Sequence, residues 1–415
     1  MLNQQPYIEK CVSELAEISE QDNPYTRLIF SKEFYQAREW LSHEFSKLDL
    51  PTKTDCAGNL IGTYKSNQTT EKKVMIGSHL DTVRAGGRFD GVAGIVSSLA
   101  IIKDFRQNNV ELPFDIEIYD YLGEELNDWN ISCLGTRAMS GFLDDEILNR
   151  KDANGRVLKD EIDKAGGESQ KLGEKFECFA DVVGCFELHI EQGRVLEKAE
   201  IDIGIVKSIP SISRHKIQII GQAGHSGTTL MTDRKDALVV AAHFITFIND
   251  EATKLSKKAN RHFVATVGKI ENYPNAATII SSKVEMILDL RVVDVSHRNE
   301  FLNKLCAKID SVNSSSEVCV KLSDVAYSPY VELNPKLNTL IESSAKTEGL
   351  SYIHMDSGAG HDTAHLARSA PASMIFIPCK DGLSHCPEEF ASADDIQKGS
   401  MVISRSIMGL ANSID

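Results

Sequence analysis

The stretch KKVMIGSHLDTVRAGGRFDGVAGIVSSLAIIKDF, residues 72–105, followed by FDIEIYDYL at 114–122, decides the fold. Its first nine residues form a β-rich run that ends in polar side chains, and residues 91–105 have the apolar content of a helix that begins at a Gly-rich turn. Residues 114–122 alternate apolar and polar side chains, which is typical of a strand. A strand, a helix and a second strand in this order predict a parallel sheet with helices on both faces.

The pattern changes after a further strand at 183–193. Four alternating strands and two helical stretches follow in the order of a ferredoxin-like domain, with strands at 214–221, 262–270, 283–293 and 317–325 and helices at 233–255 and about 296–312. The chain then returns to a helix, a strand and a closing helix, at 334–348, 372–378 and 392–412. We therefore predict an α/β fold with a mixed, mostly parallel sheet flanked by helices. It is formed by residues 1–211 and 329–415 and interrupted by an inserted α+β domain at 212–328.

Composition places the chain among soluble globular proteins. It has 415 residues, of which 42% are hydrophobic and 25% charged, and its formal net charge of −15 argues against a nucleic-acid surface. We find no apolar run of the roughly 18 residues that span a bilayer, and no signal peptide. The nine cysteines include no C-x-x-C pair and are scattered through apolar stretches. This usage indicates a reducing compartment, and we expect the cytoplasm.

Residues that can bind metals or carry protons lie at or just beyond the predicted strand ends. They are His79 with Asp81, Asp90, the adjacent Glu124 and Glu125, His189 and His385. Because sites in open α/β sheets gather beyond the carboxyl ends of the strands, we expect these side chains to meet at one edge. Imidazoles and carboxylates together suit zinc, manganese or cobalt. With one bridging carboxylate they would hold two metals about 3.5–4 Å apart.

The paired glutamates predict a division of roles, since at a strand end one of them can bind metal while the other takes a proton. Asp81 lies two residues after His79 and points to the same side of the strand, so we expect it to fix that imidazole by hydrogen bonding. Each feature alone also has an ordinary structural explanation, such as a turn or a solvated acidic face. The prediction therefore depends on their joint occurrence.

A second metal site is suggested by His361-Asp362-Thr363-Ala364-His365. The two histidines are four residues apart, which resembles the H-E-x-x-H metalloprotease motif with Asp in place of Glu. The shorter Asp side chain would reach a bound water less well than Glu.

The residues at these strand ends resemble the metal-dependent M20-type amidohydrolases, and most closely their hydantoinase/carbamoylase branch. That branch contains N-carbamoyl-L-amino-acid hydrolases, β-ureidopropionases and allantoate amidohydrolases. The matching stretches run in family order over nearly the whole chain: GSHLDTVRAGGRFDGVAG (77–94), GEE (123–125), LGTRAMSG (134–141), ELHIEQGRVLE (187–197), GQAGHSGTTLMTDRKDAL (221–238), NAATI (275–279), DLRVVD (289–294), DSGAGHDT (356–363) and PCKDGLSHCPEE (378–389).

The resemblance implies a role for each matching residue. It implies a site for two divalent metals, zinc, manganese or cobalt, in which Asp90 bridges and Glu124 is the general base. The implied metal ligands are His79, Asp90, Glu125, His189 and His385. The implied substrate-binding residues are Gln192, His225, Asn275, Arg291 and Gly360, with His361 lining the pocket. The inserted domain would be the lid and dimerisation domain, and the protein a homodimer.

Two stretches depart from the branch pattern. Glu125 is followed by LNDWNISC, at 126–133, where the branch continues with a Gly-[small]-Arg-Phe segment. Residues 211–217 (SISRHKI) lack the aromatic residue that usually opens the lid strand. Both departures lie where the pocket would be shaped, so they bear on the identity of the substrate.

The function we expect is hydrolysis of the ureido C–N bond of an N-carbamoyl amino acid, whose carboxylate Arg291 would bind as a charge pair. Without the resemblance, Arg291 would be interpreted as a surface ion pair. The stretch LGTRAMSG favours the carbamoylases over the allantoate enzymes. The alternatives are an allantoate amidohydrolase, an N-acyl-amino-acid or dipeptide hydrolase of the wider family, and a binding protein that has lost catalysis. The presence of Glu124 and of all five ligands argues against the last.

Overall fold

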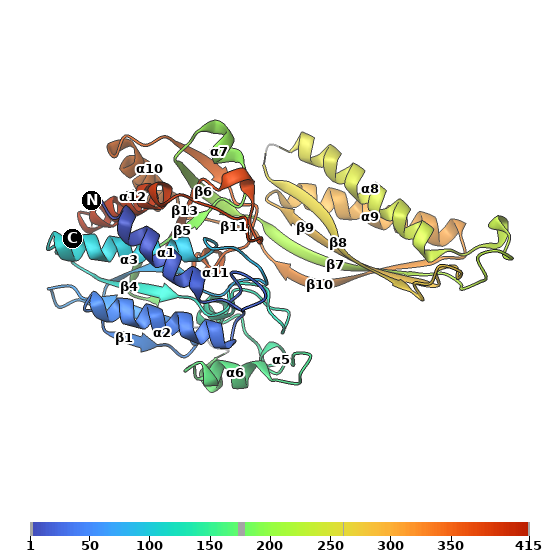
Figure 1. The fold of residues 1–415 in the computed structure, drawn as a ribbon. Helices are drawn as coiled ribbons and strands as arrows, with labels where there is room; N and C mark the ends of the chain where they lie inside the picture. Colours follow the sequence, from blue (N-terminus) through green and yellow to red (C-terminus); the bar gives the residue numbers. More distant parts are fainter. Residues whose placement is uncertain (1–2, 173–178, 260, 414–415) are drawn as a thin grey trace. The chain divides into compact units, whose positions relative to one another are not determined.

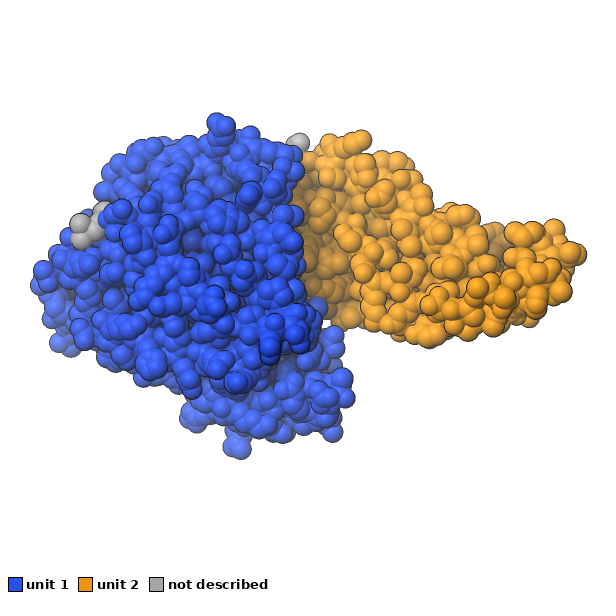
Figure 2. Space-filling view, viewed as in Figure 1, with its two compact units in different colours: residues 1–207, 332–355, 361–415 blue, residues 208–331, 356–360 orange. Residues whose placement is uncertain are grey.

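A computed structural model describes residues 3–172, 179–259 and 261–413. The chain divides into two compact units, coloured separately in Figure 2. Unit 1 contains residues 1–207, 332–355 and 361–415, and unit 2 contains residues 208–331 and 356–360. The sequence predicted an insertion at 212–328. Unit 2 starts four residues earlier, ends three later and adds the short segment 356–360.

Unit 1 is built on a mixed nine-stranded sheet in the order β1-β2-β4-β3-β5-β13-β6-β11, with β12 paired to β6. The four central strands, β4, β3, β5 and β13, are parallel, whereas β1 and β2 on one side and β6 on the other run antiparallel to their neighbours. The strands are β1 (Thr52–Thr54), β2 (Leu60–Tyr64), β3 (Lys73–Ser78), β4 (Asp115–Asp120), β5 (Val182–Ile190), β6 (Ile203–Ile209), β11 (Val331–Glu332), β12 (Tyr352–Asp356) and β13 (Ala372–Ile377). The mixed α/β fold predicted from the sequence is confirmed.

Helices cover both faces of this sheet (Figure 1). The first face carries α1 (Gln5–Glu17), α3 (Val92–Gln107), α10 (Pro335–Thr347) and α12 (Ala393–Ala411), whose buried side chains belong to one hydrophobic cluster. The second face carries α4 (Leu134–Met139), α5 (Asp145–Leu148), α6 (Leu158–Lys164) and α11 (Thr363–Leu366), which join a second cluster. Helix α2 (Lys32–Lys47) contributes to both clusters, and α7 (Val195–Ala199) precedes β6.

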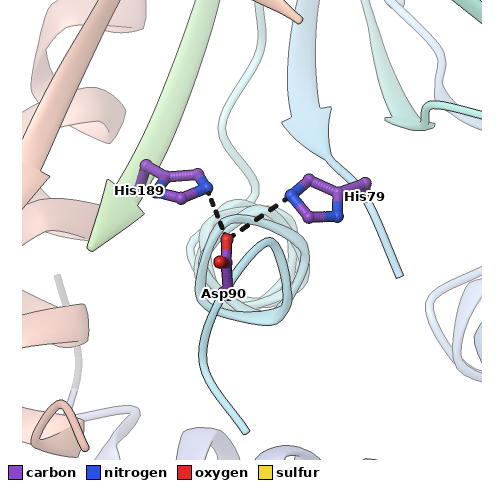
Figure 3. Close-up of side chains that lie close together, drawn as sticks. All are labelled: His79, Asp90 and His189. Carbon is purple, nitrogen blue, oxygen red and sulfur yellow. Dashed lines mark ion pairs between the residues drawn. The ribbon is translucent and has the colours of Figure 1, made fainter. Parts of the chain in front are cut away.

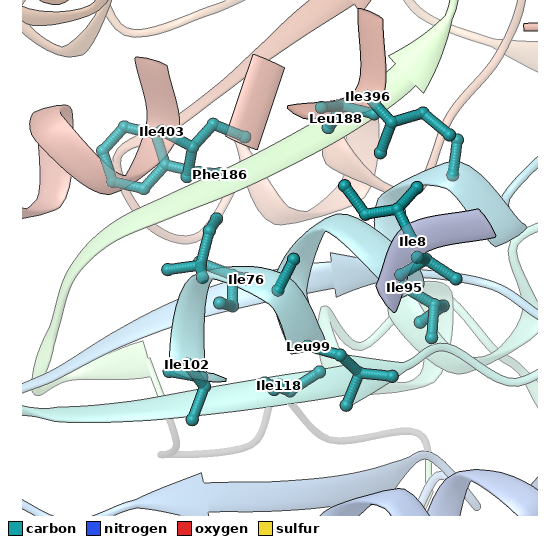
Figure 4. Packing of buried hydrophobic residues seen from close by; sticks show 14 of the residues in the cluster. Ile8, Ile76, Ile95, Leu99, Ile102, Ile118, Phe186, Leu188, Ile396 and Ile403 are labelled. Carbon is teal, nitrogen blue, oxygen red and sulfur yellow. The ribbon is translucent and has the colours of Figure 1, made fainter. Parts of the chain in front are cut away.

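Helix α3 lies in the middle of the first cluster and is apolar on almost every side. It packs against β3, β4 and β5 on one side and against α1 and α12 on the other (Figure 4), which is why its sequence shows no polar face. Its N-cap residue, Gly91, has φ 67°, and a Cβ there would lie 2.4 Å from the carbonyl oxygen of His79. Only glycine therefore lets the start of α3, with Asp90 just before it, approach the end of β3.

Unit 2 has the order β7 (Ser211–Ile220), α8 (Ala237–Lys258), β8 (Phe263–Tyr273), β9 (Lys283–Val292), α9 (Val295–Ser315) and β10 (Cys319–Ser328). The strands form an antiparallel sheet in the order β10-β7-β9-β8. Both helices pack on one face of it, where a third hydrophobic cluster lies, and the alternating burial of β7 and β9 follows from this one-sided cover. The other face of the sheet carries polar and charged side chains such as Arg214, Asp289 and Arg291.

The sequence prediction missed several short or peripheral strands. It did not predict β1, β2, β6, β11 or β12. These strands are two to seven residues long and pair at or near the sides of the sheet, so their period-two signal is weak. No disulfide joins the cysteines within the described ranges. None of the helices in those ranges is long and apolar enough to cross a bilayer.

The packing of α3 predicts a large cost for removing a side chain from its centre. Leu99 is fully buried between the sheet and its neighbouring helices, so Leu99→Ala should lower the free energy of unfolding by about 2–5 kcal/mol. Val195→Ala, on an exposed position of α7, is the matched control and should cost about 0.5 kcal/mol or less. Urea denaturation measures both, and equal effects of the two variants would contradict the packing described for α3.

Candidate metal centre

Three predicted ligands meet where β3 and β5 end and α3 begins. His79 follows β3, His189 lies near the end of β5, and Asp90 precedes the first turn of α3 (Figure 3). The Asp90 Oδ1 atom lies 3.0 Å from His189 Nε2 and 3.7 Å from His79 Nε2. All three side chains are buried, and their ligand atoms lie within 4.8 Å of one another. The parallel arrangement of β3 and β5 thus brings together residues 110 positions apart.

The two imidazoles are held with the same nitrogen facing Asp90. His79 Nδ1 lies 2.9 Å from the carbonyl oxygen of Asp81, and His189 Nδ1 lies 2.9 Å from that of Ile190. A carbonyl oxygen only accepts hydrogen bonds, so each Nδ1 must carry the proton and each Nε2 presents a lone pair in the neutral ring. His79 Nε2 is buried and makes no hydrogen bond to any described residue. Both rings are therefore oriented as metal-binding histidines are.

The second oxygen of Asp90 faces a second group of ligands. Asp90 Oδ2 lies 3.1 Å from His385 Nε2, which in turn lies 3.4 Å from Glu125 Oε1. These three residues also have ligand atoms within 4.8 Å of one another. The His385 side chain is 48% exposed, whereas those of Asp90 and Glu125 are buried. Asp90 is thus common to both groups, one oxygen to each, which is the arrangement of a bridging carboxylate.

Glu124 and Asp81 stand beside these groups. Glu124 Oε2 lies 3.7 Å from His79 Nε2, so its carboxylate faces the first group. The carboxylate of Asp81 accepts hydrogen bonds from the main-chain N–H groups of Glu124, at 3.2 Å, and Glu125, at 3.1 Å. We expected this carboxylate to hold the His79 imidazole. The imidazole instead donates from Nδ1 to the Asp81 carbonyl oxygen. The carboxylate orients the glutamate pair, because the strand end brings both main-chain N–H groups to it.

The carboxyl groups of Asp90, Glu124 and Glu125 are crowded together at this edge of the sheet. Burial, together with the nearby charges of Glu125 and Asp362, raises the pKa of Glu124 well above its usual value. Burial and the charge of Asp90 raise the pKa of Glu125 to about 8. Burial opposes the ionisation of Asp90 as well. Hydrogen bonds from His189 and His385, whose pKa values rise to about 9 beside it so that both rings are protonated when no cation is bound, hold the pKa of Asp90 well below the ordinary value.

This chemistry fits divalent cations. Buried carboxylates crowded together are stable when positive charge lies among them. The donors are imidazole nitrogens and carboxylate oxygens, a set that suits zinc, manganese or cobalt. The orphaned Nε2 of His79 would gain a partner from such an ion.

Two predicted substrate-binding residues lie in unit 1. Gln192 donates from Nε2 to Asp90 Oδ2, at 2.7 Å, and so contacts the shared acid directly. His361 is buried with its ring edge against His189, at 4.6 Å between centroids. His361, His189 and Glu187 form a further group of close ligand atoms. His365 joins no such group among the described residues.

The other predicted substrate-binding residues lie in unit 2, at opposite ends of its sheet. Arg291 pairs with Ile212, beside Gly360, whose Cβ would lie 3.1 Å from Ile212. His225 and Asn275 follow β7 and β8 at the end where both strands pair with Lys283. Arg291 lies eight positions after Lys283 along β9, which is about 27 Å of strand.

The 126–133 loop, which departs from the branch pattern, is well anchored. Trp129 is buried, and its ring meets that of Phe30 in a T-shaped arrangement. Its Nε1 donates to the carbonyl oxygen of Arg156 at 2.9 Å. The loop ends at Cys133, beside the glutamate pair, and the Cys133 Sγ atom lies 3.6 Å from Glu124 Oε1. Leu126, directly after Glu125, is 48% exposed.

The alternative His361/His365 site does not have the geometry of its motif. Helix α11 begins at Thr363, so His361 lies outside it and the two rings do not share a helical face. His365 is buried near Arg137 and Arg368, and burial together with these charges lowers its pKa well below the ordinary value.

Sequence reasoning missed Ser384 and Glu389. The Ser384 hydroxyl lies 3.2 Å from Asp90 Oδ2 and donates to Glu389 Oε2 at 2.8 Å. Glu389 is fully buried. The only available signal was its position four residues after His385 in a matching stretch.

Comparison with known proteins finds relatives over nearly the whole chain. The family model described as peptidase family M20/M25/M40 matches residues 75–409. An N-carbamoyl-L-amino-acid amidohydrolase from Pseudomonas sp. (strain NS671) is 34% identical over 96% of both chains. An allantoate amidohydrolase from Bacillus subtilis (strain 168) is 28% identical over 94% of this chain and 93% of its own. The crystal structure of an amidase of the hydantoinase/carbamoylase family from Burkholderia multivorans superposes with a TM-score of 0.86, at 26% identity over 98% of both chains.

The hydrogen bonds of Asp81 predict a measurable loss of metal affinity in Asp81→Asn. Asparagine keeps one acceptor oxygen and turns an N–H group toward the other main-chain N–H, so the glutamate pair should shift. We expect metal affinity to fall by about 10–100-fold, measured by calorimetric titration with Mn²⁺. Asp160→Asn, at an exposed position on α6, should leave affinity unchanged, and an equal affinity in Asp81→Asn would show that these hydrogen bonds do not support the site.

Proposed function

Because this chain belongs to peptidase family M20/M25/M40 and is a hydrolase of amide-type C–N bonds, we propose that it cleaves the ureido bond of an N-carbamoyl amino acid. The observation that carries the proposal is the position of Asp90, with one oxygen toward His79 and His189 and the other toward His385. The 34% identity to an N-carbamoyl-L-amino-acid amidohydrolase supports the substrate class. The proposal includes a cytoplasmic location, for which the buried thiols of Cys11 and Cys133 are suited.

The centre would hold two divalent ions, zinc, manganese or cobalt. His79, His189 and Asp90 would bind one ion, and Asp90, Glu125 and His385 the other. When bound, such ions lower the pKa of water toward 7 and polarise a carbonyl group. Glu124, whose Oε2 lies 3.7 Å from His79 Nε2, accepts the proton of the attacking water and returns it to the leaving amino nitrogen. The products are the free amino acid and carbamic acid, which decomposes to carbon dioxide and ammonia.

Two residues of unit 2 have hydrogen-bond donors that can bind substrate oxygens. His225 Nδ1 accepts a hydrogen bond from the Gly227 N–H at 3.0 Å, so in the neutral ring Nε2 carries the proton and can donate to a developing oxyanion. Arg291 is oriented by Asp289, at 2.9 Å from Nε, and by the Gly358 carbonyl oxygen, at 3.2 Å from Nη1. Its Nη2 has no hydrogen bond to a described residue and is available for the substrate carboxylate. Asn275 and Gly360 would assist in substrate binding, as would Gln192 and His361.

The separation of His225 from Arg291 supports a homodimer. A substrate the size of a carbamoyl amino acid does not span the about 27 Å of β9 that lies between them. We therefore propose that Arg291 binds the substrate of its own chain, and that His225 and Asn275 serve the partner's site. Unit 2 offers suitable surfaces for such contact, since β8 is an edge strand and Leu238 and Val239 on α8 are exposed.

An allantoate amidohydrolase is the alternative within the same chemistry, supported by the 28% identical relative from Bacillus subtilis. Allantoate also carries ureido groups and a carboxylate, so the same residues would act on it. The 126–133 loop, with exposed Leu126 directly after Glu125, is placed to discriminate between such substrates.

Ammonia release tests the function directly. The wild-type protein with Mn²⁺, Zn²⁺ or Co²⁺ should release ammonia from N-carbamoyl-L-amino acids in preference to β-ureidopropionate and allantoate. Glu124→Gln should lower kcat by about 10²–10⁴-fold or more, because the proton acceptor is lost, while metal content by elemental analysis is unchanged. Turnover by Glu124→Gln would remove this residue as the base, and an inert metal-loaded wild-type protein would favour a binding role.

Mixing two inactive variants tests whether His225 serves the partner's site. Glu124→Gln and His225→Ala each inactivate every site of their own homodimers. After denaturation and refolding together, a mixed dimer would have one site with both Glu124 and His225. Random pairing of equal amounts predicts recovery of about a quarter of wild-type activity. If His225 serves its own chain, the mixture regains nothing.

A further inference from the structure

Glu389 connects two loops that are 300 residues apart in the sequence. Its Oε1 atom accepts hydrogen bonds from the main-chain N–H groups of Phe89, at 2.8 Å, and Asp90, at 3.0 Å. Its Oε2 atom accepts a hydrogen bond from the Ser384 hydroxyl at 2.8 Å. Each oxygen of this buried carboxylate thus serves a different loop.

The loops joined in this way carry Asp90 and His385, two ligands of the same proposed metal position. His79 and His189 are fixed by the ends of strands, but His385 lies on a loop after β13, with φ 57° and a side chain 48% exposed. Its position relative to Asp90 therefore depends on contacts made by its own loop. Ser384, directly before His385, makes such contacts with both Asp90 Oδ2 and Glu389.

The backbone opposite Glu389 is shaped to admit it. Gly87 has φ 109°, and a Cβ there would lie 2.4 Å from Glu389 Oε1 and 2.5 Å from its carboxyl carbon. The neighbouring residues also pack together, since the rings of Phe89 and Phe390 lie 5.4 Å apart in an edge-on arrangement. Gly87 thus leaves room for the Glu389 carboxylate, and the contact between the two rings joins the loop before α3 to the loop after β13.

We infer that Glu389 is a positioning residue that fixes Asp90 relative to His385 and thereby sets the affinity of the metal position formed by Asp90, Glu125 and His385. The inference rests on the proposed two-metal centre. Glu389 touches neither substrate nor ion in this role. It acts through the main chain of Asp90 and through Ser384.

Metal binding measures this role without reference to activity. Calorimetric titration of the metal-free protein with Co²⁺ should give two sites in the wild type. In Glu389→Ala, one of the two should bind about 10–100-fold more weakly, because two main-chain N–H groups and a hydroxyl lose their acceptor. Glu389→Gln is the matched control. Its oxygen can accept from Phe89 and Asp90 while its amide donates to Ser384, so affinity should stay close to the wild type.

His385→Ala identifies the affected site, since it removes a ligand of that position alone. Adding Glu389→Ala to His385→Ala should change the remaining affinity little. Loss of both metals to the same extent in Glu389→Ala, or two unchanged affinities, would overturn the inference, and a wild type that does not bind two ions would overturn the proposed centre itself. If Glu389→Ala is poorly folded by its melting transition, Ser384→Ala is the second variant. It keeps the two main-chain hydrogen bonds to Glu389 Oε1, removes the hydroxyl that contacts Glu389 Oε2 and Asp90 Oδ2, and should weaken the same site.

Discussion

The proposed metal centre depends on one buried carboxylate, that of Asp90, remaining ionised. Asp90 is 4% exposed, and a charge so far from water is stable only among donors and cations. Here His189, His385 and Gln192 supply them, and the pKa of Asp90 falls well below its ordinary value despite its burial. Glycine at position 91 permits this arrangement, because it lets α3 begin against the backbone of His79. The apolar packing of α3 then fixes where Asp90 stands.

The parallel centre of the sheet explains why the remaining groups meet there. Strands β3, β5 and β13 run side by side in one direction, so the segments that follow them end at a common edge. His79 and His189 come from the first two, and His385 from the loop after the third. The glutamate pair follows β4, on the other side of β3. Four parallel strands thus bring one centre together from residues spread over more than 300 positions.

Much of this could be predicted from the sequence, for identifiable reasons. The strand before Glu124 is visible in its alternating pattern, and the strands that carry His79 and His189 are visible as β-rich runs that end in polar residues. The apolar run of α3 is visible in its composition. The resemblance to the hydantoinase/carbamoylase branch is confirmed by the family match and by the relatives. The role of the Asp81 carboxylate was not predictable, because its partners are main-chain N–H groups placed only by the fold. The role of Glu389 was not predictable either, because the N–H groups that it accepts from lie on a loop 300 residues away. The positions of His225 and Arg291 at opposite ends of the unit 2 sheet follow from strand register, which the sequence does not show.

The central claim is that Asp90 lies between two ions, and a crystal structure of the protein grown with Mn²⁺ tests it most directly. Anomalous scattering should show two peaks about 3.5–4 Å apart, one beside His79 and His189 and the other beside Glu125 and His385. A single peak, or two peaks that do not share the Asp90 carboxylate, would contradict the account.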